Sequence, residues 1–459
     1  MKNSPVRPGA ISRRFRAPCV RVWQLAWPMI LSNITVPLLG AVDTAVLGHL
    51  SSPEYLSGVA IGASVISMLL WAFGFLRMGT TGLVARANDD ADGAAWLLRA
   101  LCLAGVLGSL LLLLASPLLP VIVQWMNASA EASPHAHAYL QIRLLSAPLA
   151  LANFALLGFF IGRLDSRAPL AILVTANLLN IVLDLLLILG LGMGAQGAAW
   201  ASVCADVCGF AMGLWLMGKR HQPAVTQIRR VLLESNFWPW RNAAPWRELL
   251  HINADLFVRT CLLLFTLTFF TAQGAAQGDT VLAANAILLQ LLMMTSYALD
   301  GFAHATESLV GRAVGRRSMA QFVRTNAAAG TWALTSAVLI TLLLIGGEHW
   351  ILPLFTNIPA VLSASLEYYT WLCALPLVAV WSYQLDGVFI GAGKSRQMRD
   401  TMIIATVMVF LPCWWLTRHW GNDGIWFSLF LWFGARSCGL MVYFYNYTKN
   451  NHWMSLELR

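Results

Sequence analysis

The chain has 459 residues, of which 58% are hydrophobic and 11% are charged, and its formal net charge is +9. This composition, together with a strongly positive mean hydropathy, is typical of a polytopic membrane protein and excludes an ordinary soluble domain. The basic residues lie mainly in loops between apolar segments, so we expect the lipid bilayer as a partner and no nucleic acid.

The apolar segments predict the fold class. A membrane-spanning helix needs about 20 mostly apolar residues, and twelve segments meet this requirement, which leaves no room for a sizeable soluble domain. We predict an all-α integral membrane protein with twelve transmembrane helices. The predicted helices are centred near residues 35, 67, 112, 150, 179, 206, 262, 291, 337, 377, 409 and 435.

The N-terminal tail, residues 1–21, carries positive charge only. Six basic residues and no acidic residue precede the first long apolar segment. That segment is too long for a cleaved signal peptide and lacks a small-residue cleavage site. We therefore predict an uncleaved first helix behind a basic cytoplasmic tail.

The first predicted helix contains a single acidic residue. Asp43 is the only formally charged side chain between Arg21 and Glu54. An ionised group at the centre of a membrane helix costs about 2.5 to 3.5 kcal/mol, so such residues usually face a cavity and take part in function. Pro28 and Pro37 in the same helix each remove a backbone hydrogen bond and predict a hinge below the carboxylate.

Helices 4 to 6 add polar side chains at a similar depth. Asp184 is isolated in a second apolar run, and Asn180 lies one turn before it on the same helix face. Asn153 lies near the middle of the fourth helix, and Ser202 and Asp206 lie toward the outer end of the sixth. If these helices form one bundle, their oxygen atoms converge with the acid of the first helix on one pocket.

Two kinds of ion suit such a pocket. Burial and a second nearby carboxylate both favour the protonated form of an acid, so the pocket could hold a proton. Alternatively, the oxygen atoms of Asp43, Asn180 and Asp184 would suit a sodium ion. No zinc spacing, disulfide framework or catalytic motif appears in the sequence, so we expect no other metal, no cofactor and no enzymatic activity.

The connection at residues 219–247 divides the chain into two similar halves. A shift of 226 residues aligns 56–87 with 282–313, and a shift of 229 aligns FIGRLDSR (160–167) with FIGAGKSR (389–396). Each half has an even number of helices, so we predict two six-helix lobes related by a pseudo-two-fold axis along the membrane normal. We assign the first lobe to residues 22–218, a cytoplasmic linker to 219–247, the second lobe to 248–447 and a cytoplasmic tail to 448–459.

The isolated acidic pair belongs to the first half only. The repeat aligns Asp43 with Phe269 and Asp184 with Cys413. Ion coupling is therefore expected in the first lobe.

Three other acids are candidates for a secondary site. Asp206 accompanies the first-lobe cluster, whereas Asp300 and Asp386 lie in the inner half of the second lobe. The two second-lobe acids either form another ion or substrate site or pair with Arg259 or Arg77.

The distribution of basic residues predicts the topology. Lys and Arg concentrate in the N-terminal tail and in every second loop, whereas the alternate loops near residues 49, 130, 192, 276 and 354 carry none and Arg418 is the exception. By the positive-inside rule, both termini are cytoplasmic. We expect a multi-pass protein of the cell (inner) membrane.

Six segments distributed along the chain carry a family resemblance. They are WPMILSNITVPLLGAVDTAVLGHL, FLRMGTTGL, SAPLALANFALLG, NLLNIVLD, YALDGFA and LDGVFIGAG. With these segments the chain resembles, over nearly its whole length, the multidrug and toxic compound extrusion (MATE) transporters and their DinF-like branch. The resemblance implies a twelve-helix, two-lobe antiporter that exports lipophilic, often cationic compounds in exchange for protons or sodium ions, and we expect it to function as a monomer.

The resemblance also implies a coupling site. In similar proteins of this branch the site is formed by residues that match Asp43, Asn153, Asn180 and Asp184, and by a threonine at the position of Ser202, which retains the hydroxyl. Ion binding there is expected to shift the first helix and to disfavour the bound compound. The alternative function is a flippase for lipid-linked glycans or lipids of the same superfamily, which a strongly cationic interior would favour.

Overall fold

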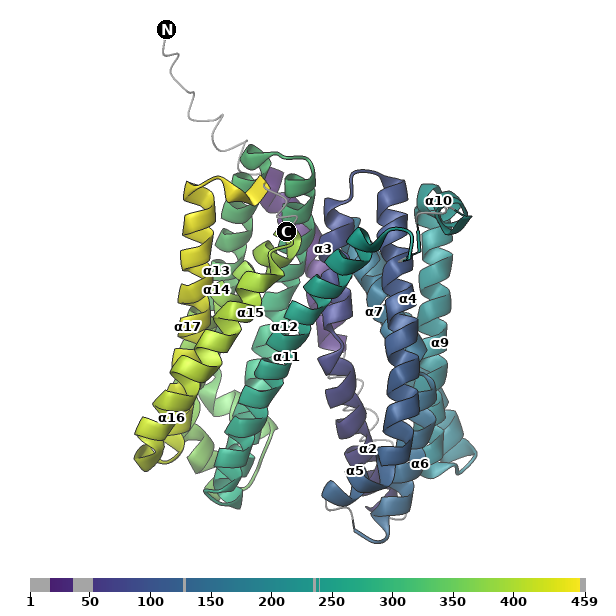
Figure 1. The fold of residues 1–459 in the computed structure, drawn as a ribbon. Helices are drawn as coiled ribbons and strands as arrows, with labels where there is room; N and C mark the ends of the chain where they lie inside the picture. The colour runs from purple at the N-terminus through teal and green to yellow at the C-terminus, as the bar shows by residue number, and fades with distance from the viewer. Residues whose placement is uncertain (1–16, 36–52, 127–128, 234–236, 239, 455–459) are drawn as a thin grey trace. The chain divides into compact units, whose positions relative to one another are not determined.

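The computed structural model describes residues 17–35, 53–126, 129–233, 237–238 and 240–454 (Figure 1). Within these ranges the regular structure is entirely helical, which confirms the all-α prediction. Contacts divide the chain into two compact units. The first unit is Leu31–Asn253, and the second unit combines the N-terminal residues up to Ile30 with Ala254–Arg459.

The first unit begins within the helix over residues 17–35, which is the first described helix of the chain. Its core is made by apolar side chains that include Val59, Ile66, Leu140 and Leu144. Its helices in chain order are α2 (Pro53–Ala72), α3 (Phe75–Arg86), α4 (Asp90–Ala115), η1 (Ser116–Leu118), α5 (Leu119–Trp125), α6 (Ala132–Leu145), α7 (Ala147–Gly162), α8 (Arg167–Asp184), η2 (Leu185–Gly190), α9 (Gly194–Arg220) and α10 (Gln222–Leu233).

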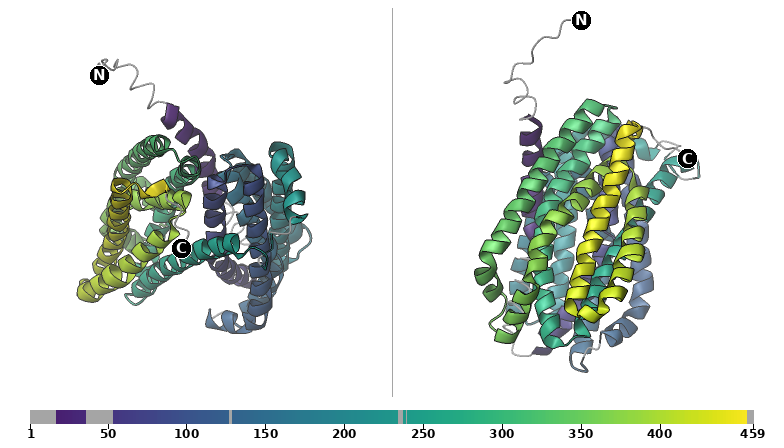
Figure 2. Two further views of the ribbon diagram at one scale, coloured as in Figure 1. Left: turned by 45° about the horizontal axis from the view of Figure 1, so that its top comes forward. Right: turned by 90° about the vertical axis from the view of Figure 1, so that its left-hand side faces the viewer.

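The second unit is entered through α11 (Ala243–Ala275) and has its own core around Phe270, Leu288, Trp426 and Trp432. The yellow α17 and the green helices that precede it run alongside one another in the right-hand view of Figure 2. The remaining helices are α12 (Asp279–Gly315), α13 (Met319–Ile351), η3 (Leu352–Leu354), α14 (Pro359–Ala392), α15 (Ser395–Ile403), η4 (Ile404–Phe410), α16 (Leu411–Thr417), η5 (Arg418–Trp420), α17 (Asn422–Lys449) and η6 (His452–Met454).

The described helices have the length and surface of membrane spans. Ten are long and apolar enough to cross a membrane, and the bent pair α6 and α7, which meet at 52°, makes up to eleven. Leu113, Leu343 and Met408 are 70%, 69% and 70% exposed, as expected for side chains that contact lipid rather than water. The first of the twelve predicted spans includes residues 36–52, which lie outside the described residues.

Equivalent helices of the two halves differ in continuity. α2 and α3 are separated by a turn at Phe73–Gly74, whereas α12, which the repeat aligns with them, runs for 37 residues without a break. α8 continues after Asp184 as the π-helical segment η2, and α15 continues as the π-helical segment η4. π-helical turns often occur at functional sites. Because η2 starts directly after Asp184, its position supports a functional role for this acid.

Two helix ends at equivalent positions of the repeat share one backbone geometry. Leu164 follows α7 with a φ of 64°, and Gly393 follows α14 with a φ of 71°. In each turn the next residue donates its backbone N–H to the carbonyl five residues before it, over 2.9 Å after Leu164 and 2.8 Å after Gly393. This is the Schellman arrangement that commonly ends a helix, and its recurrence at the 229-residue offset confirms the alignment of FIGRLDSR with FIGAGKSR.

The residue types at these two ends predict opposite mutational effects. A left-handed backbone costs an L-residue such as Leu164 about 1 to 2 kcal/mol, whereas glycine adopts it freely. We expect Leu164→Gly to raise the free energy of unfolding by about 1 kcal/mol and Gly393→Ala to lower it by a similar amount. Thermal unfolding of the full-length protein in detergent measures both changes, and two shifts of the same sign would contradict the assignment.

The turn after α7 also holds the end of α9. The carboxylate of Asp165 accepts a hydrogen bond from Arg220 Nη1 over 3.1 Å and lies 3.4 Å from His221 Nε2. Burial alone would raise the pKa of Asp165, but the hydrogen bond with His221 and the positive charge of Arg220 hold this pKa below its ordinary value. The carboxylate is therefore ionised at neutral pH and fixes the end of α9 to the turn.

Three segments show features that the predicted domain division does not describe. Residues 22–30 group with the second unit rather than with the first lobe, and the linker 219–247 contains the helix α10. In the predicted tail 448–459, Trp453 is fully buried and packs its ring against those of Phe322 and Phe389. The boundaries were predicted from the charge and polarity of the loops. The packing of residues 22–30, α10 and Trp453 depends on tertiary contacts, which loop charge does not indicate.

Candidate functional site

α8 and α9 bring three polar side chains together inside the first unit. Asn180 and Asp184, one turn apart on α8, are each 1% exposed, and they lie beside Ser202 of α9. On the same helix Leu178 and Val182 are 59% and 58% exposed. The apolar and polar residues therefore separate onto two faces of α8, and the polar pair faces the interior of the unit.

The amide of Asn180 links the other two side chains. With its nitrogen turned toward Asp184, it donates a hydrogen bond to Asp184 Oδ2 over 2.7 Å, and its oxygen accepts from the backbone nitrogen and the hydroxyl of Ser202 over 3.2 and 3.1 Å. This orientation satisfies both ends of the amide, because its nitrogen meets an acceptor and its oxygen meets two donors.

Asn153 and Asp206 make contacts that the sequence did not predict. Asn153 Nδ2 donates to the backbone oxygen of Asp206 over 2.9 Å, and Asn153 Oδ1 is buried and accepts no hydrogen bond from the described residues. The carboxylate of Asp206 turns to Arg143 Nη1 at 2.7 Å and to Ser146 Oγ at 2.8 Å. Because the buried guanidinium of Arg143 requires a negative partner, Asp206 serves an ion pair rather than the cluster around Asp184.

The acid of the first helix cannot be placed in this geometry. Asp43 and Pro37 lie outside the described residues, and Pro28 lies buried in the helix over residues 17–35. The end of that helix contacts α8, since Asn177 Nδ2 donates to the backbone oxygen of Thr35 over 3.4 Å. The described helix therefore ends beside α8, one turn before Asn180.

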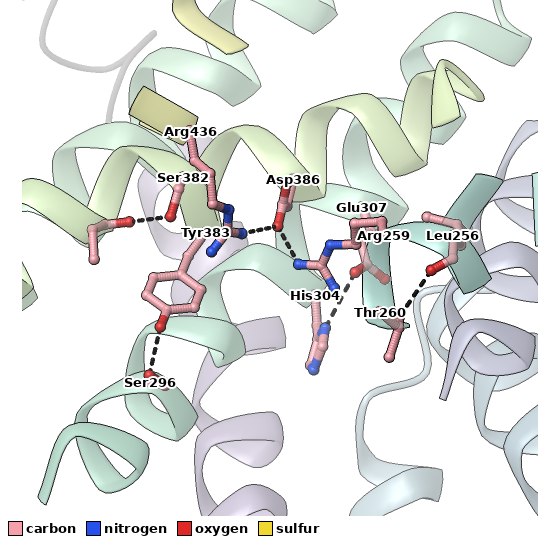
Figure 3. Close-up of polar contacts among 11 residues, drawn as sticks. Leu256, Arg259, Thr260, Ser296, His304, Glu307, Ser382, Tyr383, Asp386 and Arg436 are labelled. Atoms are coloured by element: carbon pink, nitrogen blue, oxygen red, sulfur yellow. Dashed lines mark hydrogen bonds and ion pairs between the residues drawn. The ribbon is translucent and has the colours of Figure 1, made fainter. Parts of the chain in front are cut away.

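The second unit holds a buried charge network around Asp386 of α14 (Figure 3). Its carboxylate forms an ion pair with Arg259 of α11 and another, over 3.0 Å, with Arg436 of α17. The three residues are 6%, 7% and 3% exposed, and the guanidinium of Arg436 also lies over the ring of Trp432 at 4.8 Å. Of the two possibilities for Asp386, an ion or substrate site or a charge pair, the structure therefore shows the pair with Arg259. Its carboxylate contacts two guanidinium groups, which occupy the positions that a bound cation would need.

Other polar residues of α12 lie beside this network. Asp300 is close enough to attract the charges of Arg259 and Arg436. His304 Nδ1 lies 3.4 Å from Glu307 Oε1, and a dashed line joins the two side chains in Figure 3. The sequence did not indicate that Arg436, near the middle of the last helix, would complete the network.

Comparison with protein families gives two matches within the chain. The family model described as MatE matches residues 28–186 and residues 256–415. Each match covers one half of the sequence repeat, as expected for two similar lobes.

Curated relatives and solved structures extend this likeness. DNA damage-inducible protein F of Escherichia coli (strain K12) is 40% identical over 439 residues, which cover 95% of this chain and 94% of the relative. The probable multidrug resistance protein NorM of Caulobacter vibrioides is 26% identical, with coverage of 89% and 88%. A crystal structure of MATE in the bent conformation superposes with a TM-score of 0.85 at 19% identity, covering 96% of this chain and 99% of that structure. This similarity confirms the predicted twelve-helix, two-lobe fold.

Proposed function

The chain belongs to the MatE family of membrane transporters, in the branch of the DinF protein, and we propose that it is an antiporter that exports lipophilic, often cationic compounds. The energy comes from the inward flow of protons or sodium ions. The observation that carries this proposal is the buried carboxylate of Asp184, which accepts a hydrogen bond from the amide of Asn180 beside Ser202. A relative that is named a probable multidrug resistance protein supports the class of exported compound.

The amide of Asn180 connects Asp184 to α9. It donates to the carboxylate of Asp184 and accepts from the backbone nitrogen and the hydroxyl of Ser202. A proton on Asp184 removes the negative charge that strengthens the hydrogen bond from Asn180, so protonation weakens the link between α8 and α9. A sodium ion would instead use the oxygen atoms of Asp43, Asn180 and Asp184, with the free Oδ1 of Asn153 as an additional acceptor.

The coupling follows from differential affinity. An ion can shift the equilibrium between two transporter conformations only if it binds one more tightly than the other. A carboxylate that is buried in one conformation and hydrated in the other meets this condition. In the proposed cycle the ion binds from the outward-open state, shifts the first helix at Pro28 or Pro37, and disfavours the bound compound.

The charge distribution sets the orientation of this cycle. Both termini and the connection between the units lie in the cytoplasm, because the loops on that side carry most Lys and Arg residues. The protein resides in the cell (inner) membrane and acts as a monomer.

Gradient-driven transport by the wild-type protein tests the proposal. The full-length protein is reconstituted in liposomes, and efflux of a fluorescent lipophilic cation is followed under a pH gradient alone and under a sodium gradient alone. We expect transport under one gradient and little under the other, because a single site holds one type of ion. Absence of transport under both gradients, together with movement of a fluorescent lipid between leaflets, would contradict the antiporter and favour the flippase.

A further inference from the structure

Arg99 is buried near one end of α4. It is 8% exposed, and it lies nine residues after the first residue of the helix, which corresponds to about 14 Å along the helix axis. The linker helix α10 packs at this same end of the first unit, beside α4 and α9 (Figure 1). Arg99 therefore lies within a predicted membrane span, at the end of α4 that packs against the linker helix α10.

The contacts of Arg99 are aromatic rather than acidic. Its guanidinium lies over the ring of Trp96 at 5.1 Å and over the ring of Phe237 at 5.5 Å. Among the described residues none forms a hydrogen bond or an ion pair with Arg99, and its Nε is buried without a partner. Arg143, in contrast, forms an ion pair with Asp206 over 2.7 Å.

Two aromatic rings do not replace the hydration of a buried cation. A cation–π contact contributes about 0.5 to 2 kcal/mol, but it supplies no acceptor for the N–H groups of the guanidinium. Asp92 and Glu248 attract Arg99 from a greater distance, and Glu248 contacts Arg86 over 3.4 Å. An anion with several oxygen atoms would satisfy the guanidinium, which matches a phosphate group with two parallel hydrogen bonds.

The surface around Arg99 favours an amphipathic ligand. Trp246 Nε1 donates to the backbone oxygen of Phe237 over 2.9 Å and fixes this residue beside Arg99. The next aromatic side chains, Trp238 and Trp240, stack at 5.1 Å and are 38% and 74% exposed. Tryptophan is enriched where a protein meets the boundary between lipid headgroups and acyl chains.

The linker carries positive charge, which would attract an anionic ligand. Val231 of α10 packs against Ala95 and Leu98 of α4, so the linker lies directly on the helix that carries Arg99. The segment 219–247 contains six Lys and Arg residues and one acidic residue. Basic residues at this depth are attracted to anionic lipid headgroups.

We propose that Arg99, Trp96 and Phe237 bind the phosphate group of an anionic phospholipid, while Trp238 and Trp240 contact its glycerol and acyl region. The lipid comes from the leaflet that the proposed topology places on the cytoplasmic side. It ties the linker to α4, because Arg99 and Phe237 belong to these two segments. A free phosphate ion has no apolar part that could contact the exposed rings of Trp238 and Trp240, whereas a phospholipid does.

Lipid titration of the purified full-length protein in detergent tests this site. Phosphatidylglycerol and phosphatidylcholine with the same acyl chains are added separately, and bound lipid is counted by native mass spectrometry. We expect Arg99→Gln to weaken phosphatidylglycerol binding about tenfold, equivalent to about 1.4 kcal/mol, and to leave phosphatidylcholine binding unchanged. Arg99→Lys keeps the charge and is expected to weaken binding less.

Arg167→Gln is the matched control, because it removes the same charge from an exposed position at the start of α8, outside the linker. Equal losses in Arg99→Gln and Arg167→Gln would indicate diffuse attraction and overturn the site. Full competition by glycerol phosphate at millimolar concentration would overturn the lipid as its source. If Arg99→Gln does not fold, Phe237→Leu removes one ring from the same site, and unchanged binding in that variant would also overturn the proposal.

Discussion

Asp184→Asn is expected to abolish gradient-driven export while leaving the protein folded. Asparagine has nearly the shape of aspartate, and its oxygen still accepts the hydrogen bond from the amide of Asn180. It cannot take up a proton or carry a negative charge, so the hydrogen bond from Asn180 no longer changes strength with ionisation. Each pKa unit by which a coupling acid differs between conformations corresponds to about a tenfold shift of their equilibrium, and we expect efflux to fall at least about tenfold.

Efflux of a lipophilic cation from liposomes measures this loss. Asp279→Asn is the matched control, because Asp279 is an exposed acid at the start of α12, far along the chain from the cluster. We expect it to transport at the wild-type rate. Thermal unfolding should show that both variants lie within about 1 kcal/mol of wild type. Wild-type efflux in Asp184→Asn would remove this residue from the coupling site.

Asp386→Asn is expected to lower the free energy of unfolding by about 3 to 5 kcal/mol, because it leaves buried positive charges without their partner. Arg259 and Arg436 both contact Asp386 and are 7% and 3% exposed. Asp300 would still attract the two guanidinium groups, but their direct ion pairs with Asp386 would be lost. The unfolding temperature of the full-length protein in detergent measures the effect.

A double variant distinguishes charge imbalance from lost packing. Asp386→Asn with Arg436→Gln removes one charge of each sign, so Arg259 again has one acid, Asp300, for its one positive charge. We expect the double variant to be more stable than Asp386→Asn alone. If the two losses simply add, packing rather than charge balance explains the effect, and the account of the network is wrong.

The sequence predicted the parts of the fold that depend on local periodicity. Asn180 and Asp184 are four residues apart in an apolar run, so a helix must place them on one face, and their contact with Ser202 requires only that α8 and α9 pack together. The repeat aligned the two segments that form the equivalent turns after α7 and α14. These features follow from residue spacing, which the sequence displays directly.

Contacts between distant helices could not be predicted in the same way. Arg436 pairs with Asp386 across 50 residues, and the pair depends on how α14 and α17 are rotated about their axes. Asp206 lies one turn from Ser202 but pairs with Arg143, because a buried guanidinium competes for the carboxylate. Spacing identifies which residues share a helix face, whereas these pairings are decided by packing.

Compound-dependent ion movement tests the central claim, that carboxylates of the first unit couple ion entry to export. The wild-type protein and the variants Asp43→Asn and Asp184→Asn are reconstituted in liposomes that contain a dye for the coupling ion. Addition of the transported compound on one side should move the ion in the opposite direction in the wild-type protein and in neither variant. Compound-dependent ion movement that persists in both variants would contradict the account.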